Sequence, residues 1–110
     1  MKLTDLEPQF LKVISEHEFK CIDDIKDADG IMFLCPVCFK KNNDDSGRGV
    51  HSINCWQPHV PQNIHPIPGR WNFLGTGYND LTLKNGSSSI LLNGGCNAHF
   101  WITNGEIILT

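Results

Sequence analysis

Four potential metal ligands stand in two pairs of identical spacing, Cys35 with Cys38 and Cys96 with His99. Thiolate sulfur and imidazole nitrogen are the donors that zinc binds in a tetrahedron, and a C-x-x-C turn offers two thiolates at a suitable separation. Read together, the pairs predict one Cys3His site for Zn²⁺. Because protein atoms would fill all four positions, the site is expected to be structural rather than catalytic.

The alternative interpretation is a set of buried apolar cysteines, with His99 hydrogen-bonded inside a sheet. The second pair favours zinc over this alternative, because it follows an apolar run and a Gly-Gly turn, as expected of a zinc knuckle. The two pairs are 57 residues apart, so the metal would join distant parts of the chain. Closing so long a loop reduces the entropy of the unfolded state.

A second group of reactive residues comprises Cys55, His51, His59 and His65, in or beside a proline-rich segment. A thiolate beside a histidine base can act as a nucleophile, and several histidines can hold a second metal ion. Catalysis would also need a third group to orient the pair, and no such group stands out in the sequence. We therefore favour a core cysteine and ordinary loop histidines.

Three tryptophans, Trp56, Trp71 and Trp101, are many for a short chain. Together with His51 and Cys55 on one concave face, they would line a pocket for a flat or cationic ligand. Packing in the core and on sheet surfaces is the simpler interpretation, which we favour. The pocket is kept as a candidate site.

The elements that must position these residues are mostly short strands, since the apolar positions favour β-branched and aromatic residues between turns. Residues 30–34 form an apolar run that ends at Cys35, and Asn104-Gly105 is a strong hairpin signal. A hairpin is expected within residues 1–26, a helical turn within 23–29, a polar loop at 40–49 and an extended connection at 57–69. Strands are predicted over residues 9–15, 19–22, 30–34, 50–56, 71–74, 81–83, 88–92, 100–103 and 106–109.

Length and composition fit one small domain spanning residues 1–110. The expected fold is mainly β, with two short antiparallel sheets pinned by zinc and little helix. The net charge is −3 without a basic stripe, which argues against nucleic-acid binding. No apolar run of about 18 residues and no signal-peptide pattern is present, so we expect a cytoplasmic protein without a membrane partner. In that compartment, cysteines serve as metal ligands more often than as disulfides.

Several strings of the sequence resemble a family of small uncharacterised proteins from tailed bacteriophages and prophages, classed as a domain of unknown function. The resemblance covers residue 27 to the end, and residues 3–10 are also similar. It implies a phage or prophage origin and the host cytoplasm as location. The strings are Asp27-Ala28-Asp29-Gly30, Cys35-Pro36-x-Cys38, Gly49-x-His51-Ser52, Cys55-Trp56, Pro68-Gly69-Arg70-Trp71, Gly75-Thr76-Gly77, Asp80-Leu81-Thr82-Leu83, Ser88-Ser89-Ile90, Gly95-Cys96-x-Ala98-His99-Phe100 and Asn104-Gly105-x-Ile107.

The expected arrangement of two knuckles on opposed sheets is more loosely similar to the β-tent proteins. These include the thalidomide-binding domain of cereblon and zinc-containing methionine sulfoxide reductases. Cys96-x-x-His99 departs from their second C-x-x-C, so the resemblance implies an architecture and not a reaction.

These observations favour a non-enzymatic zinc-binding module that binds a host protein or a small ligand. One alternative is a small metal- or cysteine-dependent enzyme that uses Cys55, His51, His59 and His65. Another is a virion or assembly component.

Overall fold

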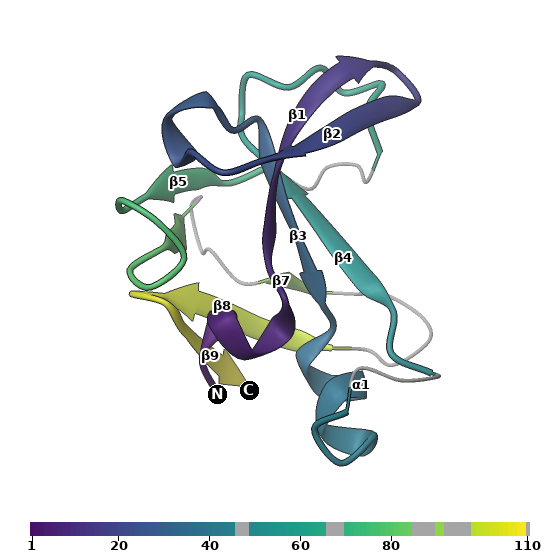
Figure 1. Cartoon of the computed structure of the whole chain (residues 1–110), viewed down its shortest axis with the longest axis vertical. Helices are drawn as coiled ribbons and strands as arrows, with labels where there is room; N and C mark the ends of the chain where they lie inside the picture. The colour runs from purple at the N-terminus through teal and green to yellow at the C-terminus, as the bar shows by residue number, and fades with distance from the viewer. Residues whose placement is uncertain (46–48, 66–69, 85–89, 92–97, 110) are drawn as a thin grey trace.

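The computed structural model describes residues 1–45, 49–65, 70–84, 90–91 and 98–109 (Figure 1). Its elements are mostly strands, which confirms the predicted mainly β class. The strands form three antiparallel sheets in the described part of the chain, one more than expected, with orders β2-β1-β3-β4, β5-β6 and β7-β8-β9. The element bounds are η1 Leu3–Leu6, β1 Gln9–Ser15, β2 Glu18–Ile22, η2 Ile25–Asp27, β3 Gly30–Leu34, α1 Pro36–Lys41, β4 Ser52–Trp56, β5 Asn72–Leu74, β6 Thr82–Lys84, β7 Ile90–Leu91, β8 His99–Thr103 and β9 Glu106–Leu109.

The four-stranded sheet is covered on both faces by apolar clusters. Successive side chains of a strand point to opposite faces, so Cys55 joins the larger cluster while its neighbour Trp56 joins the smaller one. We call these the main core and the outer cluster. The main core also contains Phe33 of β3, whereas the outer cluster consists of Leu11, Trp56, Val60 and Ile64.

The sheet β7-β8-β9 closes the main core from the other side. Ile90, Phe100, Ile102 and Ile107 are buried there, one from β7, two from β8 and one from β9. The ring of Phe100 packs edge-on against Phe33 of β3, with centroids 6.0 Å apart. The main core therefore lies between two sheets, as in a small sandwich.

The hairpin β8–β9 confirms the signal of Asn104-Gly105. These two residues have φ values of 50° and 75°, which a tight hairpin turn between right-twisted strands requires. The Gly105 N–H donates to the Leu81 carbonyl, and the Gly105 carbonyl accepts from the Leu3 N–H, both at 2.8 Å. A Cβ at Gly105 would overlap the carbonyl of Asn79. The turn therefore joins three segments, which only glycine allows.

The proline-rich segment folds back on the outer cluster. Its two ends meet at an isolated β-bridge between Trp56 and Arg70. The Arg70 guanidinium is buried and donates to the carbonyls of Val60, Pro61 and Ile64. Val60 and Ile64 pack against the Trp56 ring. The described part of this connection is an Ω-like loop held by one arginine and two apolar anchors.

Two expectations about local structure need adjustment. The predicted knuckle at residues 35–39 continues as helix α1, Pro36–Lys41, which also takes up the start of the predicted 40–49 loop. Pro36 favours this because it stands at the first helical position, where its missing N–H costs nothing. The predicted strand 88–92 is described only as Ile90–Leu91, and residues 85–89 and 92–97 lie outside the described residues.

Candidate metal centre

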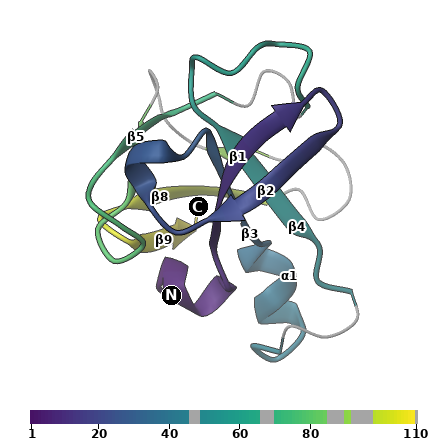
Figure 2. The same ribbon diagram turned by 45° about the horizontal axis from the view of Figure 1, so that its top comes forward.

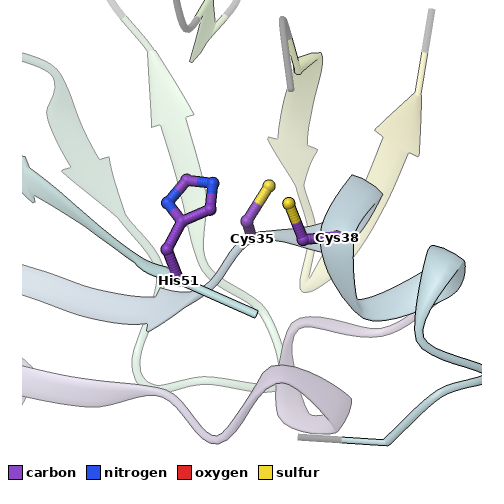
Figure 3. A group of neighbouring side chains, drawn as sticks. All are labelled: Cys35, Cys38 and His51. Carbon is purple, nitrogen blue, oxygen red and sulfur yellow. The ribbon is translucent and has the colours of Figure 1, made fainter. Parts of the chain in front are cut away.

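Three potential ligands gather where β3, α1 and β4 meet: Cys35, Cys38 and His51 (Figure 3). Their two sulfur atoms and one ring nitrogen all lie within 4.8 Å of one another. In a tetrahedral zinc site with bonds of about 2.0–2.3 Å, ligand atoms are roughly 3.7 Å apart. The cluster therefore fits one metal ion, and its donors are those that zinc prefers.

The pairing of β3 with β4 brings His51 to Cys35. The antiparallel register sets Leu34 opposite Ser52, so the next pair in the same register is Cys35 and His51. The Cys35 N–H donates to the His51 carbonyl at 2.8 Å, which continues the ladder by one step. Residues directly opposite each other in an antiparallel pair present their side chains on the same face, about 5 Å apart. The two ligands are thus neighbours by register.

Helix α1 supplies Cys38. Cys35 is the N-cap residue, and the Phe39 N–H donates to its carbonyl at 2.9 Å, which forms the first helical turn. Residues three apart on a helix lie on the same face, so Cys38 is placed beside Cys35. An extended strand, a proline at the first helical position and one turn of helix suffice to bring the two thiols together.

The centre extends from the core to the surface. Cys35 is completely buried, Cys38 is partly exposed and His51 is exposed. An ion held here would have a dry inner side and a side that solvent reaches through the imidazole. Substituting His51 should consequently disturb ligation with little loss of core packing.

The structure brings together two of the four predicted zinc ligands. Cys35 and Cys38 come together as expected, whereas Cys96 lies outside the described residues. His99 is half-buried at the start of β8, with its ring centroid 5.4 Å from that of Trp101, and it is not a member of the described cluster. His51, which the sequence suggested for a second site or a pocket, is the histidine that joins the two cysteines. A prediction that strand 30–34 pairs with strand 50–56 would have identified His51 as a neighbour of Cys35.

The second reactive group is dispersed. Cys55 is completely buried in the main core, and burial raises the pKa of its thiol far above the usual range. His59 is bound to Asp29, and the His65 carbonyl accepts a hydrogen bond from Trp56 Nε1 at 2.8 Å. Among the described residues, no second metal-binding cluster includes any of these histidines. The thiolate that a cysteine nucleophile requires is disfavoured at Cys55.

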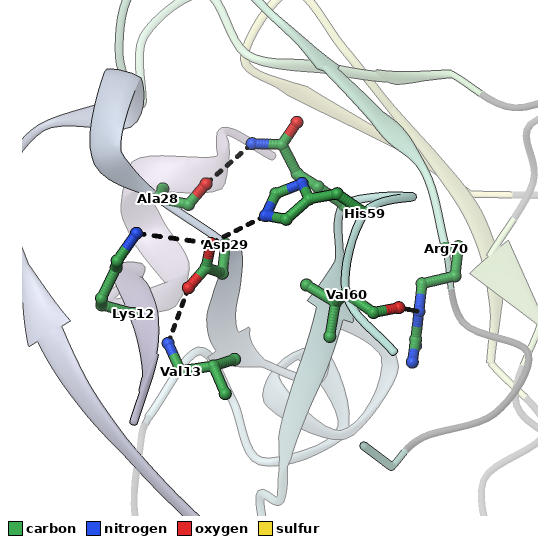
Figure 4. Close-up of polar contacts among 8 residues, drawn as sticks. Lys12, Val13, Ala28, Asp29, His59, Val60 and Arg70 are labelled. Carbon is green, nitrogen blue, oxygen red and sulfur yellow. Dashed lines mark hydrogen bonds and ion pairs between the residues drawn. The ribbon is translucent and has the colours of Figure 1, made fainter. Parts of the chain in front are cut away.

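Asp29 forms a separate polar network with Lys12, Val13 and His59 (Figure 4). Its carboxylate accepts the Val13 N–H at 2.8 Å and lies 2.8 Å from His59 Nε2 and 3.6 Å from Lys12 Nζ. Burial alone would raise the pKa of Asp29, but these hydrogen bonds and the lysine charge together lower it below the usual value. The network attaches the start of the Ω-like loop to β1.

The tryptophans of the candidate pocket do not face one hollow in the described chain. Trp56 is buried in the outer cluster, whereas Trp71 packs against the main core on the other face of the four-stranded sheet. Trp101 is half-buried beside His99 on β8. Cys55 and Trp56 likewise point to opposite faces. The structure thus distributes these residues in the manner of the packing interpretation.

A surface hollow does exist at another place, and its lining comes from the N-terminal segment and from α1 with the residues just after it. The short N-terminal helix η1 and α1 lie side by side in Figure 2. Its lining residues are Met1, Asp5, Phe39, Lys40 and Asp44. Charges of both signs line it, and none of the tryptophans contributes.

Searches of protein-family models, curated proteins and solved structures found no match to this chain. The resemblances to phage proteins and to β-tent folds therefore stay predictions. No helix among the described residues is long and apolar enough to cross a membrane.

Proposed function

We propose that this chain is a zinc-binding module in which one Zn²⁺, held by Cys35, Cys38, His51 and Cys96, stabilises a surface that binds a partner. The observation that carries the proposal is the convergence of the first three ligands within 4.8 Å. Two thiolates and an imidazole form a set that is selective for zinc over magnesium or calcium. A third thiolate would complete a Cys3His set, with His51 in place of the His99 that the sequence predicts.

The choice of Cys96 as fourth ligand is supported by its neighbours in the sequence. Ala98, two residues further on, is buried in the main core together with Cys35. Phe100, two residues beyond Ala98, contacts Phe33, which is itself two residues before Cys35. Two extended residues span about 7 Å, so a ligand two positions before Ala98 would be compatible with the cluster, and we include Cys96 on that ground.

The role proposed for the metal is structural. It would join the ends of β3 and β4 to α1 and, through Cys96, to the segment that precedes β8. Structural zinc in small peptides contributes roughly 10 kcal/mol or more, which is as large as the whole stability of an ordinary small domain. The core of this chain is modest for its length, so a contribution of that size would be decisive.

A non-enzymatic role follows from a closed set of four ligands, since substrate would find no open position on the metal. Burial of Cys55 also weakens the alternative of a cysteine-dependent enzyme. A metal-dependent enzyme would instead keep water as the fourth ligand. The two roles therefore differ in a measurable quantity, the number of sulfur ligands on the metal.

A host protein or a small ligand is the partner we propose, with the phage resemblance as support. Capture of proteins from host lysate on the immobilised chain tests this part. The partner should bind the zinc-loaded chain and be lost from a chelator-treated one, if the metal organises the binding surface.

Elemental analysis of the purified chain tests the metal directly. We expect one zinc per chain after extensive dialysis, together with a large fall in melting temperature when a strong chelator is added. A metal-free protein that melts at the same temperature with and without chelator would refute the proposal.

A further inference from the structure

We propose that Cys35 and Cys38 form an oxidant-sensitive pair, in which hydrogen peroxide or a related two-electron oxidant converts both metal-binding thiolates into one reversible disulfide. This inference rests on the proposed function, because the two sulfurs that the oxidant would join are two of the proposed zinc ligands. It adds a modification site and a means of regulation to the metal centre.

The positions of the two cysteines on α1 suit a disulfide. Residues three apart at the start of a helix have Cα atoms about 5 Å apart, and disulfides need roughly 4.4–6.8 Å. The two sulfur atoms already lie within 4.8 Å of each other. Cys38 is partly exposed, which leaves its side chain room to turn toward Cys35.

Exposure assigns different roles to the two sulfurs. Cys38 lies on the side that solvent reaches, whereas Cys35 is completely buried. Cys38 is therefore the thiolate that meets the oxidant, and Cys35 is the resolving thiolate. The thiolate form of cysteine is the species that reacts with the oxidant.

The reaction balances as a two-electron oxidation. The Cys38 thiolate attacks one peroxide oxygen, the O–O bond breaks, and hydroxide leaves and takes up a proton to become water. Cys38 is then a sulfenic acid. The Cys35 thiolate attacks its sulfur, forms the S–S bond and displaces the second hydroxide, which is also protonated to water. Two electrons pass from the sulfurs to peroxide, and a dithiol reductant reverses the change.

Loss of two of the ligands should release the metal and remove the stabilisation that the proposed zinc site provides. Cys35 itself belongs to the main core, and the five residue pairs of the β3–β4 ladder continue directly from the centre. The oxidised chain should therefore melt at a lower temperature than the zinc-loaded chain, and α1 and the start of β4 should lose their fixed positions. A partner that recognises this region would be released.

The other described cysteines serve as internal controls. Cys21 is exposed on β2, away from the cluster, and Cys55 is completely buried with a raised pKa. Exposure without a neighbouring thiol should allow only slow or dead-end oxidation at Cys21. Burial should protect Cys55.

The test treats the zinc-loaded full chain with stoichiometric hydrogen peroxide and follows zinc with a colorimetric indicator. Intact mass and peptide mapping identify the products. We expect zinc release in step with a Cys35–Cys38 disulfide, and rebinding after dithiothreitol and zinc are supplied. The Cys21→Ser variant should behave like the wild type, whereas Cys38→His should keep its zinc in peroxide.

The outcomes separate this inference from the proposed function. If the purified chain holds no zinc, the proposed function has already failed. Zinc that stays bound in peroxide, or leaves with Cys38 as sulfinic acid, overturns the inference alone. A disulfide from Cys96 to either partner also overturns it. Mapping of the wild type decides these cases even if Cys38→His does not fold.

Discussion

Substitution of His51 by alanine separates the two histidines that could complete the metal site. The His51 side chain is exposed and lies opposite Cys35 in the β3–β4 register, so its loss removes a ligand and almost no core contact. If four ligands share a zinc contribution of roughly 10–16 kcal/mol, one ligand accounts for about 3 kcal/mol. That corresponds to a roughly hundredfold weaker affinity for zinc.

The same figure predicts the change in melting temperature. A chain of 110 residues has an unfolding entropy of about 0.23 kcal/mol/K near its melting point. A loss of about 3 kcal/mol should thus lower the melting temperature of the zinc-loaded protein by about 13 °C. Thermal unfolding followed by circular dichroism, with excess zinc and again with a strong chelator, isolates the part of the shift that depends on metal.

The matched control is His99→Ala, which removes the histidine that the C-x-x-H spacing suggested. We expect His99→Ala to keep the full difference in melting temperature between zinc and chelator, even if lost packing with Trp101 lowers both values. His51→Ala should reduce that difference by about 13 °C. The reverse pattern, with the metal-dependent shift lost in His99→Ala and kept in His51→Ala, would refute the assignment.

Three further predictions concern the fold. Gly105→Ala should lower the free energy of unfolding, measured in urea, by more than about 2 kcal/mol, since the new Cβ would overlap the Asn79 carbonyl and φ is positive. The control is Gly49→Ala, which also has a positive φ but lies in open space, so it should lower the free energy of unfolding by only about 1 kcal/mol. Arg70→Met should lower the free energy of unfolding by about 3 kcal/mol, because the carbonyls of the Ω-like loop lose a buried donor. It should also reduce the hydrogen-exchange protection of that loop. Because the pKa of Asp29 is lowered on folding, its contribution to stability is complete above the ordinary value of 3.8 and is lost as the pH falls through the lowered pKa. Over that acid range the free energy of unfolding of Asp29→Asn should change less with pH than that of the wild type. Equal slopes of unfolding free energy against pH for the two proteins would contradict the network.

The local sequence pattern was sufficient to predict the structure of segments whose conformation depends only on their own residues. The apolar run at 30–34 is strand β3 with the predicted bounds, and Asn104-Gly105 makes the hairpin turn that its φ values require. In each case steric preference or side-chain periodicity acts within a few residues.

The metal centre depended on information that local pattern does not carry. Alternation shows which face a residue occupies, but not which strand lies beside it. The pairing of β3 with β4 is set by the packing of both faces, and only this pairing puts His51 opposite Cys35. Spacing instead suggested His99, which is three residues from Cys96 in the sequence. The same limit explains why the sequence did not show where the tryptophans lie. Trp56 is buried in the outer cluster, which the Ω-like loop completes.

Zinc K-edge X-ray absorption of the purified full chain tests the central claim most directly. One zinc per chain with three sulfur atoms at about 2.3 Å and one nitrogen at about 2.0–2.1 Å is the result we predict. In the His51→Ala variant the nitrogen should be lost or replaced by an oxygen from water. A spectrum with fewer than three sulfur ligands, or one that His51→Ala leaves unchanged, would contradict the account.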